Sequence, residues 1–182
     1  MTTVADRYRD VAARFSARVD AVTDWDVPSP CEGWTARDVV GHLVEWFPPF
    51  IAQGADITLA PGPSVADDPV GAWHTLDREV QAVLDDPATA GRRFHHDHAG
   101  DHDLDAAIGQ FFVNDVLVHT WDLARATGQD ETLDPDEVAT LLSGVEPYDD
   151  ALRVGGQYGP KVGVPADADP QTRLLAFLGR RP

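Results

Sequence analysis

Three ionisable residues, Asp115, His119 and Asp122, follow one another at spacings of four and three within an otherwise apolar segment. We predict one helix over residues 110–128, and large apolar residues surround almost its whole circumference, which is typical of a helix in the middle of a fold. At ~100° per residue, the three side chains fall within roughly 60° of one another. Buried ionisable groups are costly unless they are paired, hydrogen-bonded or bound to a metal. The spacing therefore predicts a compensating partner for this face of the helix.

Asp115 and His119 have the residue types and the spacing of metal ligands. Neutral imidazole and carboxylate groups bind zinc and similar divalent ions, and a separation of four residues directs both side chains to one side of a helix. His42 lies in a second segment rich in large apolar residues and completes a set of two histidines and one carboxylate. Such a set leaves coordination positions open for water or substrate. We therefore predict His42, Asp115 and His119 as the ligands of one metal ion.

Other polar residues are weaker candidates. Glu45 is a fourth ligand, a residue that contacts a ligand, or a surface residue. Cys31 precedes the His42 segment and could border the site, but a nucleophilic role needs a base and a lowered pKa that the sequence does not indicate. A histidine-rich stretch with interleaved aspartates fits either a loose metal site or a solvated loop, and its polar setting favours the loop. Its histidines are His95, His96, His98 and His102.

The elements that must hold these residues are mostly helices. Apolar residues at helical spacing predict four long helices, one of which starts with a capping-box signal and stops at Pro48-Pro49. The four helices cover residues 4–23, 35–47, 70–85 and 110–128, with Gly128 at the end of the last. The remaining segments are a flexible loop at 54–69, an irregular stretch at 87–103, a shorter helix from 134, an extended tail at 158–165 and a last helical turn or two at 171–178.

This order of elements predicts an all-α protein. Long helices joined by loops of mixed length are typical of a helical bundle, and bundle cores are places where metal sites are built from side chains on facing helices. We therefore predict a four-helix bundle with short additional C-terminal helices and an extended tail, in a single domain over residues 1–182.

The composition excludes several classes of partner. The chain has 182 residues, 31 of them acidic and 14 basic, which gives a net charge of −17. Because that charge repels phosphate backbones and anionic membranes, we expect no nucleic-acid partner and no membrane partner. The N-terminus lacks the pattern of a secretory signal, and no window approaches the ~18 consecutive apolar residues of a membrane span. The single cysteine fits a reducing compartment, so we expect a cytoplasmic protein.

Three segments together resemble a known family. They are the loop and helix Pro30–Glu45, the helix Asp115–Gly128 with its His-Thr-Trp-Asp-Leu-Ala motif, and the ending Tyr158–Pro182. Over nearly its whole length the chain is similar to an actinobacterial metal-binding family that is related to the N-terminal domain of mycothiol-dependent maleylpyruvate isomerase, within the DinB/YfiT-like superfamily. This resemblance implies a DinB-like four-helix bundle with a divalent metal ion held by three side chains.

Position by position, the resemblance implies His42 and His119 as the histidine ligands. It implies Asp115 as the acidic ligand, where the isomerase has a glutamate. It also implies a Lewis-acid metal, with zinc as the first choice and nickel as the second, and mycothiol as a candidate thiol cofactor. Asp122 would then orient the imidazole of a ligand.

One main hypothesis and two alternatives follow. The main hypothesis is a metal-dependent transferase or isomerase, with mycothiol as a candidate cofactor, that acts on a small-molecule substrate or thiol; a homodimer is a candidate assembly. The first alternative is a non-catalytic, metal-stabilised binding or stress-associated helical bundle, which a fourth protein ligand would favour. The second is a metal-free polar network that only fixes the packing of the core. The sequence alone does not decide between an enzyme and a binding protein.

Overall fold

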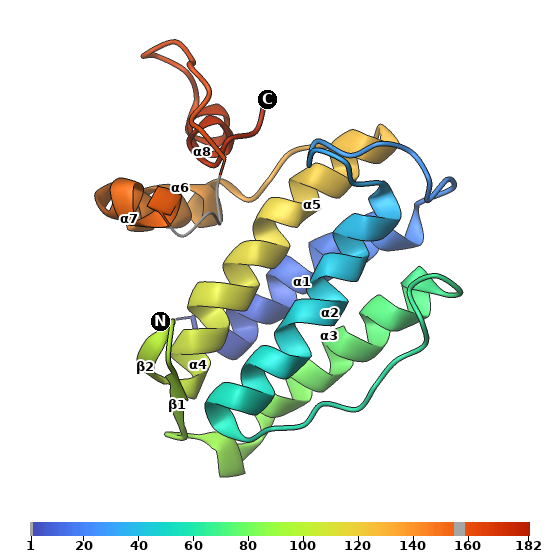
Figure 1. Ribbon diagram of the computed structural model, residues 1–182, viewed down its shortest axis with the longest axis vertical. Coiled ribbons are helices and arrows are strands. Elements are labelled where there is room, and N and C mark those ends of the chain that lie inside the picture. Colours follow the sequence, from blue (N-terminus) through green and yellow to red (C-terminus); the bar gives the residue numbers. More distant parts are fainter. Residues whose placement is uncertain (1, 155–158) are drawn as a thin grey trace.

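Four long helices form the body of the protein. The computed structural model describes residues 2–154 and 159–182. Its long helices are α1 (Val4–Asp20), α2 (Ala36–Ala55), α3 (Pro69–Asp85) and α5 (Asn114–Thr127). Helices α1 and α2 each pack against both α3 and α5, which closes a four-helix bundle (Figure 1). The prediction of an all-α, DinB-like bundle is confirmed, and within the described ranges no helix is long and apolar enough to cross a membrane.

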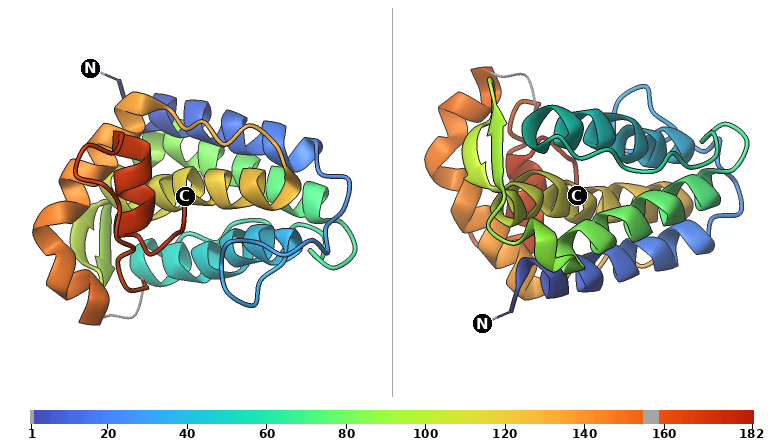
Figure 2. Two further views of the ribbon diagram at one scale, coloured as in Figure 1. Left: turned by 90° about the horizontal axis from the view of Figure 1, so that it is seen from above. Right: turned by 90° about the horizontal axis from the view of Figure 1, so that it is seen from below.

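Helix α5 is the most enclosed of the four. Every residue from Val116 to Ala124 is buried, and Figure 2 shows the helix running between α1 and α2. Gly128 follows its last turn with a φ of 68°, a left-handed conformation that glycine adopts without steric cost. The predicted helix end at Gly128 is therefore confirmed, and the polar residues of α5 do lie in the interior.

The start of this helix differs from the prediction over residues 110–128. The helical path begins at α4 (Leu104–Ala107), passes through the π-helical turn η2 (Ile108–Val113) and continues into α5. In the wider turn, the carbonyl oxygen of Gly109 accepts a hydrogen bond from Arg7 of α1 at 3.0 Å. A π-helical turn inside an α-helix is rare, and the contact made here comes from a neighbouring helix that the local sequence does not reveal.

Helix α2 does not stop at Pro48-Pro49, where the sequence predicted its end. Its capping box is present as predicted, but the helix runs through both prolines to Ala55 and ends at Asp56, whose φ is 53°. Each proline lacks the N–H of a helical hydrogen bond and disfavours helix by ~3 kcal/mol. The last turn nevertheless packs its apolar side into the core, since Ile51 is 1% exposed and Ala55 is 6% exposed. Tertiary packing therefore outweighs the local signal, and the loop predicted at 54–69 begins only after Ala55.

A small β-hairpin occupies part of the stretch that was predicted to be irregular. After the short 3-10 turn η1 (Pro87–Thr89), strand β1 (Arg93–His96) pairs antiparallel with β2 (Gly100–Asp103). Phe94 is its one buried residue, and its ring packs against Gly54 at the end of α2. Strands are predicted from alternating apolar and polar residues. Because these two strands have only one buried apolar residue between them, that alternation is absent, and the sequence did not reveal the hairpin.

The C-terminal part adds short helices beside the bundle, as predicted. They are α6 (Pro135–Val145), the 3-10 turn η3 (Glu146–Tyr148), α7 (Asp149–Val154) and α8 (Pro170–Phe177). Helix α8 packs on α6, and the segment after α8 returns toward α5 (Figures 1 and 2). Residues 159–165 have no regular secondary structure, in agreement with the predicted tail, whose first residue, Tyr158, lies outside the described residues. In the bundle, α1 ends at Asp20, three residues before its predicted end.

Candidate metal centre

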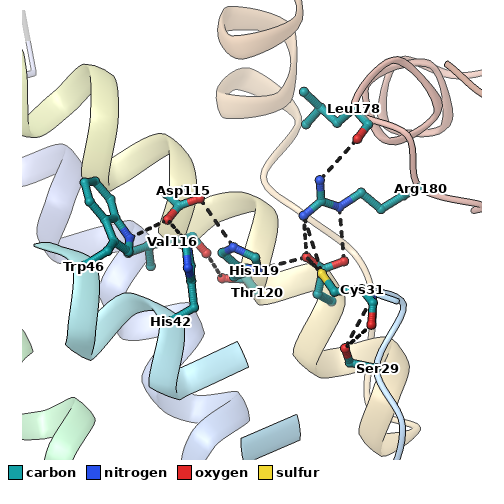
Figure 3. Close-up of polar contacts among 11 residues, drawn as sticks. Ser29, Cys31, His42, Trp46, Asp115, Val116, His119, Thr120, Leu178 and Arg180 are labelled. Carbon is teal, nitrogen blue, oxygen red and sulfur yellow. Dashed lines mark hydrogen bonds and ion pairs between the residues drawn. The ribbon is translucent and has the colours of Figure 1, made fainter. Parts of the chain in front are cut away.

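The three predicted ligands meet where α2 faces α5. Asp115 lies on the first turn of α5, and His119 follows one turn later on the same face. Oδ2 of Asp115 lies 3.0 Å from Nε2 of His42, and its Oδ1 lies 3.4 Å from Nε2 of His119. Figure 3 shows the two imidazoles next to each other, both facing this carboxylate. The structure thus brings together side chains that are 73 residues apart in the sequence.

The spacing of these atoms fits a divalent ion. Zinc binds nitrogen and oxygen ligands at ~2.0–2.2 Å, so two ligand atoms at a tetrahedral angle lie about 3.3 Å apart. The two distances from Asp115 are 3.0 and 3.4 Å, and one ligand atom from each of His42, Asp115 and His119 lies within 4.8 Å of the others. The donor set of two imidazoles and one carboxylate also suits zinc and nickel. The metal-ligand assignment itself stays a prediction, because direct ion pairs give similar distances.

Two tryptophans line the site, and the sequence analysis did not assign them to it. The indole Nε1 of Trp46 donates a hydrogen bond of 2.9 Å to Oδ2 of Asp115. The ring of Trp34 stacks on His119 with 5.9 Å between centroids and lies 5.2 Å from His42. Trp46 follows His42 by four residues, so helical spacing could have placed it on the same face. Trp34 precedes α2, and no local pattern reveals its stacking partner.

The site opens to solvent on one side. The side chains of His42 and Asp115 are 32% and 27% exposed, whereas that of His119 is 5% exposed. A small molecule can therefore approach from the side of His42 and Asp115, and His119 forms the inner wall. Glu45, considered as a fourth ligand, is exposed. Among the described residues, two groups of side chains could hold an ion, one made of His42, Asp115 and His119 and the other of Cys31, His119 and Asp122, and neither includes Glu45. The interpretation of Glu45 as a surface residue is therefore the correct one.

A second polar group lies behind His119. Asp122 is fully buried, and its Oδ2 is 2.9 Å from Nδ1 of His119. The ring N–H does not point along this line, so Nδ1 is left without an aligned hydrogen bond. The Sγ atom of Cys31 donates to the same Oδ2 at 3.6 Å, and the guanidinium of Arg180 contacts both oxygens of Asp122. Asp122 thus lies where a residue that orients His119 would lie, and Cys31 borders the site.

The charges of this face are mutually paired. Burial acts to raise the pKa of Asp115, but the charge of His119 and hydrogen bonds from His119 and His42 hold this pKa well below its usual range. Burial acts to lower the pKa of His119, but Asp115 and Asp122 raise it well above the usual value. Against the effect of burial, His119 and Arg180 lower the pKa of Asp122 to about 2. Without metal, two carboxylates therefore face an imidazolium and a guanidinium.

The histidine-rich stretch is separate from this site. It forms the hairpin, where His95 is 74% exposed and pairs with Asp101, and His102 contacts the carbonyl oxygen of Ala99 at 2.7 Å. Neither ligand group found in the described part of the chain contains a residue of the hairpin. The sequence allowed either a loose metal site or a solvated segment here and favoured the solvated segment. The exposed, internally paired hairpin agrees with the solvated segment.

Comparisons with known proteins agree with this architecture. A family model described as the mycothiol maleylpyruvate isomerase N-terminal domain matches residues 8–124, a segment that contains His42, Asp115 and His119. Two uncharacterized proteins of Mycobacterium tuberculosis, Rv0738 of strain H37Rv and MT0763 of strain CDC 1551, are each 31% identical over 185 residues, covering 96% of this chain and 94% of the relative. No solved structure matches the chain. The family model spans more than half of the sequence, and the chain therefore belongs to the mycothiol maleylpyruvate isomerase N-terminal domain family.

Proposed function

We propose that this protein binds one divalent metal ion through His42, Asp115 and His119. With this ion bound, it acts as a transferase or isomerase of small molecules. The observation that carries the proposal is the convergence of two imidazole nitrogens on the two oxygens of one carboxylate, at 3.0 and 3.4 Å. When bound, the ion supplies Lewis-acid chemistry, which lowers the pKa of a coordinated water or thiol. Zinc is the first choice and nickel the second, since both accept this donor set.

The residues of the chain prepare the site for such a ligand. Trp46 holds Oδ2 of Asp115, so the carboxylate keeps a fixed orientation toward the two histidines. Trp34 covers the ring of His119 and excludes water from the inner side of the site. The partial exposure of His42 and Asp115 leaves the outer side accessible to a small substrate. Small-molecule sites combine aromatic lining with a few placed polar groups, and Trp34 and Trp46 beside His42 and Asp115 fit that description.

Mycothiol is the thiol that we propose as the cofactor. The proposal rests on the family described by the matching model, which is named for mycothiol and for maleylpyruvate isomerase. A low-molecular-weight thiol reacts as its thiolate, and an accessible position beside a Lewis acid favours that form at neutral pH. The partial exposure of His42 and Asp115 leaves this side of the site open to such a thiol.

Metal content is the first test. The protein is stripped with a chelator, reconstituted with zinc or nickel, and analysed for bound metal together with the variants His42→Ala, Asp115→Asn and His119→Ala. We expect one ion per chain in the wild type and a loss of stoichiometric metal in each variant. His74→Ala is a matched control, because His74 also pairs with an aspartate, Asp20, but on the outside of the bundle. Full metal content in His119→Ala would refute the ligand assignment.

The same samples separate the alternatives. Absence of bound metal from the reconstituted wild type would favour the metal-free polar network. Stoichiometric metal without conversion of small electrophiles in the presence of mycothiol would favour a non-catalytic, metal-stabilised binding protein. Metal-dependent conversion of the electrophile, lost in His42→Ala, would support the enzyme: net consumption of the thiol indicates a transferase, and conversion with the thiol regenerated indicates an isomerase. X-ray absorption of the zinc form would show whether nonprotein ligands complete the coordination shell, as the enzyme requires.

A further inference from the structure

The end of the chain reaches the buried face of α5 through one arginine. Nε of Arg180 lies 3.3 Å from Oδ1 of Asp122, and its Nη2 lies 2.8 Å from Oδ2. The third guanidinium nitrogen, Nη1, donates to the carbonyl oxygen of Leu178 at 3.3 Å. The side chain of Arg180 is 14% exposed and that of Asp122 is fully buried. The two-point contact fixes the plane of the carboxylate, as planar arginine–carboxylate pairs do.

The local structure after α8 directs Arg180 to this position. Helix α8 ends at Phe177 with Leu178 as its C-cap, and Gly179 follows with a φ of 87°. The N–H of Arg180 then donates to the carbonyl oxygen of Leu175 at 2.8 Å, which closes the helix end. A Cβ atom at Gly179 would lie 3.1 Å from the Cα of Gly159. Both the left-handed backbone and the close approach therefore require glycine at the turn that leads to α5.

The charge of Arg180 has a specific importance in the metal-bound state. An imidazole that binds a metal must be neutral, so a metal-bound His119 provides no formal positive charge to Asp122. Cys31 contacts Asp122 only through a weak S–H donor. A fully buried carboxylate without a counter-ion is strongly disfavoured. Among the described residues, Arg180 then supplies the one formal positive charge in contact with Asp122.

The contact between Asp122 and His119 also depends on how the carboxylate is held. Nδ1 of His119 is the one buried side-chain nitrogen or oxygen in the described part of the chain that lacks a hydrogen bond, although Oδ2 of Asp122 is 2.9 Å away. A small rotation of the carboxylate or the ring decides whether this contact becomes a hydrogen bond. Because Arg180 holds both oxygens, it limits that rotation (Figure 3).

We propose that Arg180 is a positioning residue of the metal site. It holds Asp122 behind Nδ1 of His119 and thereby directs Nε2 of the same ring toward Asp115. The inference rests on the proposed metal-binding function, and it makes the segment after α8, which lies outside the matched residues 8–124, part of the site. The C-terminal segment thus contributes, through Arg180, to how firmly the bundle holds its ion.

Three variants test this role. Arg180→Gln removes the charge, Arg180→Lys keeps the charge but not the two-point contact, and Arg173→Gln is a matched control on α8, where Arg173 pairs with Glu146 near the surface. The dissociation constant for zinc is measured by chelator competition, and the visible spectrum of the cobalt form reports ligand geometry. We expect ~10–100-fold weaker zinc binding in Arg180→Gln, the range found when residues that orient metal ligands are changed. We expect an intermediate loss in Arg180→Lys and wild-type binding in Arg173→Gln.

The outcomes distinguish this inference from the proposed function. Wild-type zinc affinity and an unchanged cobalt spectrum in Arg180→Gln would overturn the positioning role and leave the metal site intact. If Arg180→Gln does not fold, Arg180→Lys decides, because its unchanged affinity and spectrum would equally overturn the role. If the wild type binds no metal, the proposed function fails, and nitrogen NMR of the His119 ring decides the inference. Ring signals that differ between the wild type and Arg180→Lys would support the positioning role, and identical signals would overturn it.

Discussion

Replacement of Asp122 by asparagine should change how the stability of this protein depends on pH. Asparagine has the same shape as aspartate but cannot ionise, so the variant removes one buried negative charge without creating a cavity. In the wild type this charge lies between His119, 2.9 Å away, and Arg180, 2.8 Å away. The variant leaves the guanidinium of Arg180 largely buried without its partner, and breaking a buried pair in this way costs about 3–5 kcal/mol. The free energy of unfolding at neutral pH should therefore fall.

The pH-dependent part of this effect follows from the pKa of Asp122. Burial acts to raise that pKa, but contacts with His119 and Arg180 lower it from 3.8 to about 2. One pKa unit corresponds to ~1.36 kcal/mol, so the ionised carboxylate contributes about 2 kcal/mol to the free energy of unfolding. Because the pKa is lower in the folded state, this contribution is complete above about pH 4 and is lost as the pH falls through about 2.

Urea unfolding of the metal-free proteins measures this contribution. Wild type and Asp122→Asn are compared in the presence of a chelator from pH 6 down to the lowest pH at which both fold. The difference between their free energies of unfolding should shrink by up to about 2 kcal/mol over the acidic part of this range. Asp10→Asn, at an exposed position of α1, should show no comparable trend. A difference that stays constant with pH would refute the assignment of Asp122 as an ionised, charge-paired residue.

Two further predictions concern the site and its support. Asp115 and Asp122 raise the pKa of His119 well above its usual value, so metal binding at pH 7 should release about one proton, and the metal affinity should fall with the pH. Calorimetry in two buffers of different ionisation enthalpy measures this proton release. A binding enthalpy that does not depend on the buffer would contradict the prediction. Gly54→Ala should destabilise the protein by ~1–3 kcal/mol in urea unfolding, because the new Cβ would lie 2.0 Å from the ring of Phe94. Gly144→Ala is the control, because Gly144 is exposed on α6 and a Cβ atom there would have no neighbour within 4 Å. This change should leave the free energy of unfolding unchanged or raise it slightly. Equal effects of the two changes would disprove the packing of the hairpin on α2.

Much of the fold could be predicted because helical patterns are local. The apolar stripes of α1 and α3, the capping box of α2 and the glycine after α5 are all features of short segments. The errors came where distant residues decide. Helix α2 continues through Pro48-Pro49 because its last turn packs into the core, and the hairpin forms around Phe94, whose partner Gly54 lies 40 positions earlier. No window of the sequence contains both partners of such contacts.

The candidate site shows the same division. The spacing of Asp115, His119 and Asp122 indicated a shared face, and the structure has them in one contiguous line of contacts. The sequence also selected His42, whose Nε2 does lie beside Asp115. Its function as a metal ligand stays a prediction. The sequence left the role of Glu45 undecided, because a helical pattern does not reveal how far its polar side faces solvent. The structure shows that Glu45 is exposed.

The sequence by itself determined which side chains share a face of α5, because the helical repeat sets this at short range. It also determined that this face had to be compensated, because burial of unpaired charge is unfavourable whatever the partner. Beyond His42, only the tertiary structure decided which residues contact this face. Trp34 stacks on His119, and Arg180 pairs with Asp122 from 58 positions away. Such contacts depend on the path of the whole chain in space, and the local repeat of a helix carries no information about that path.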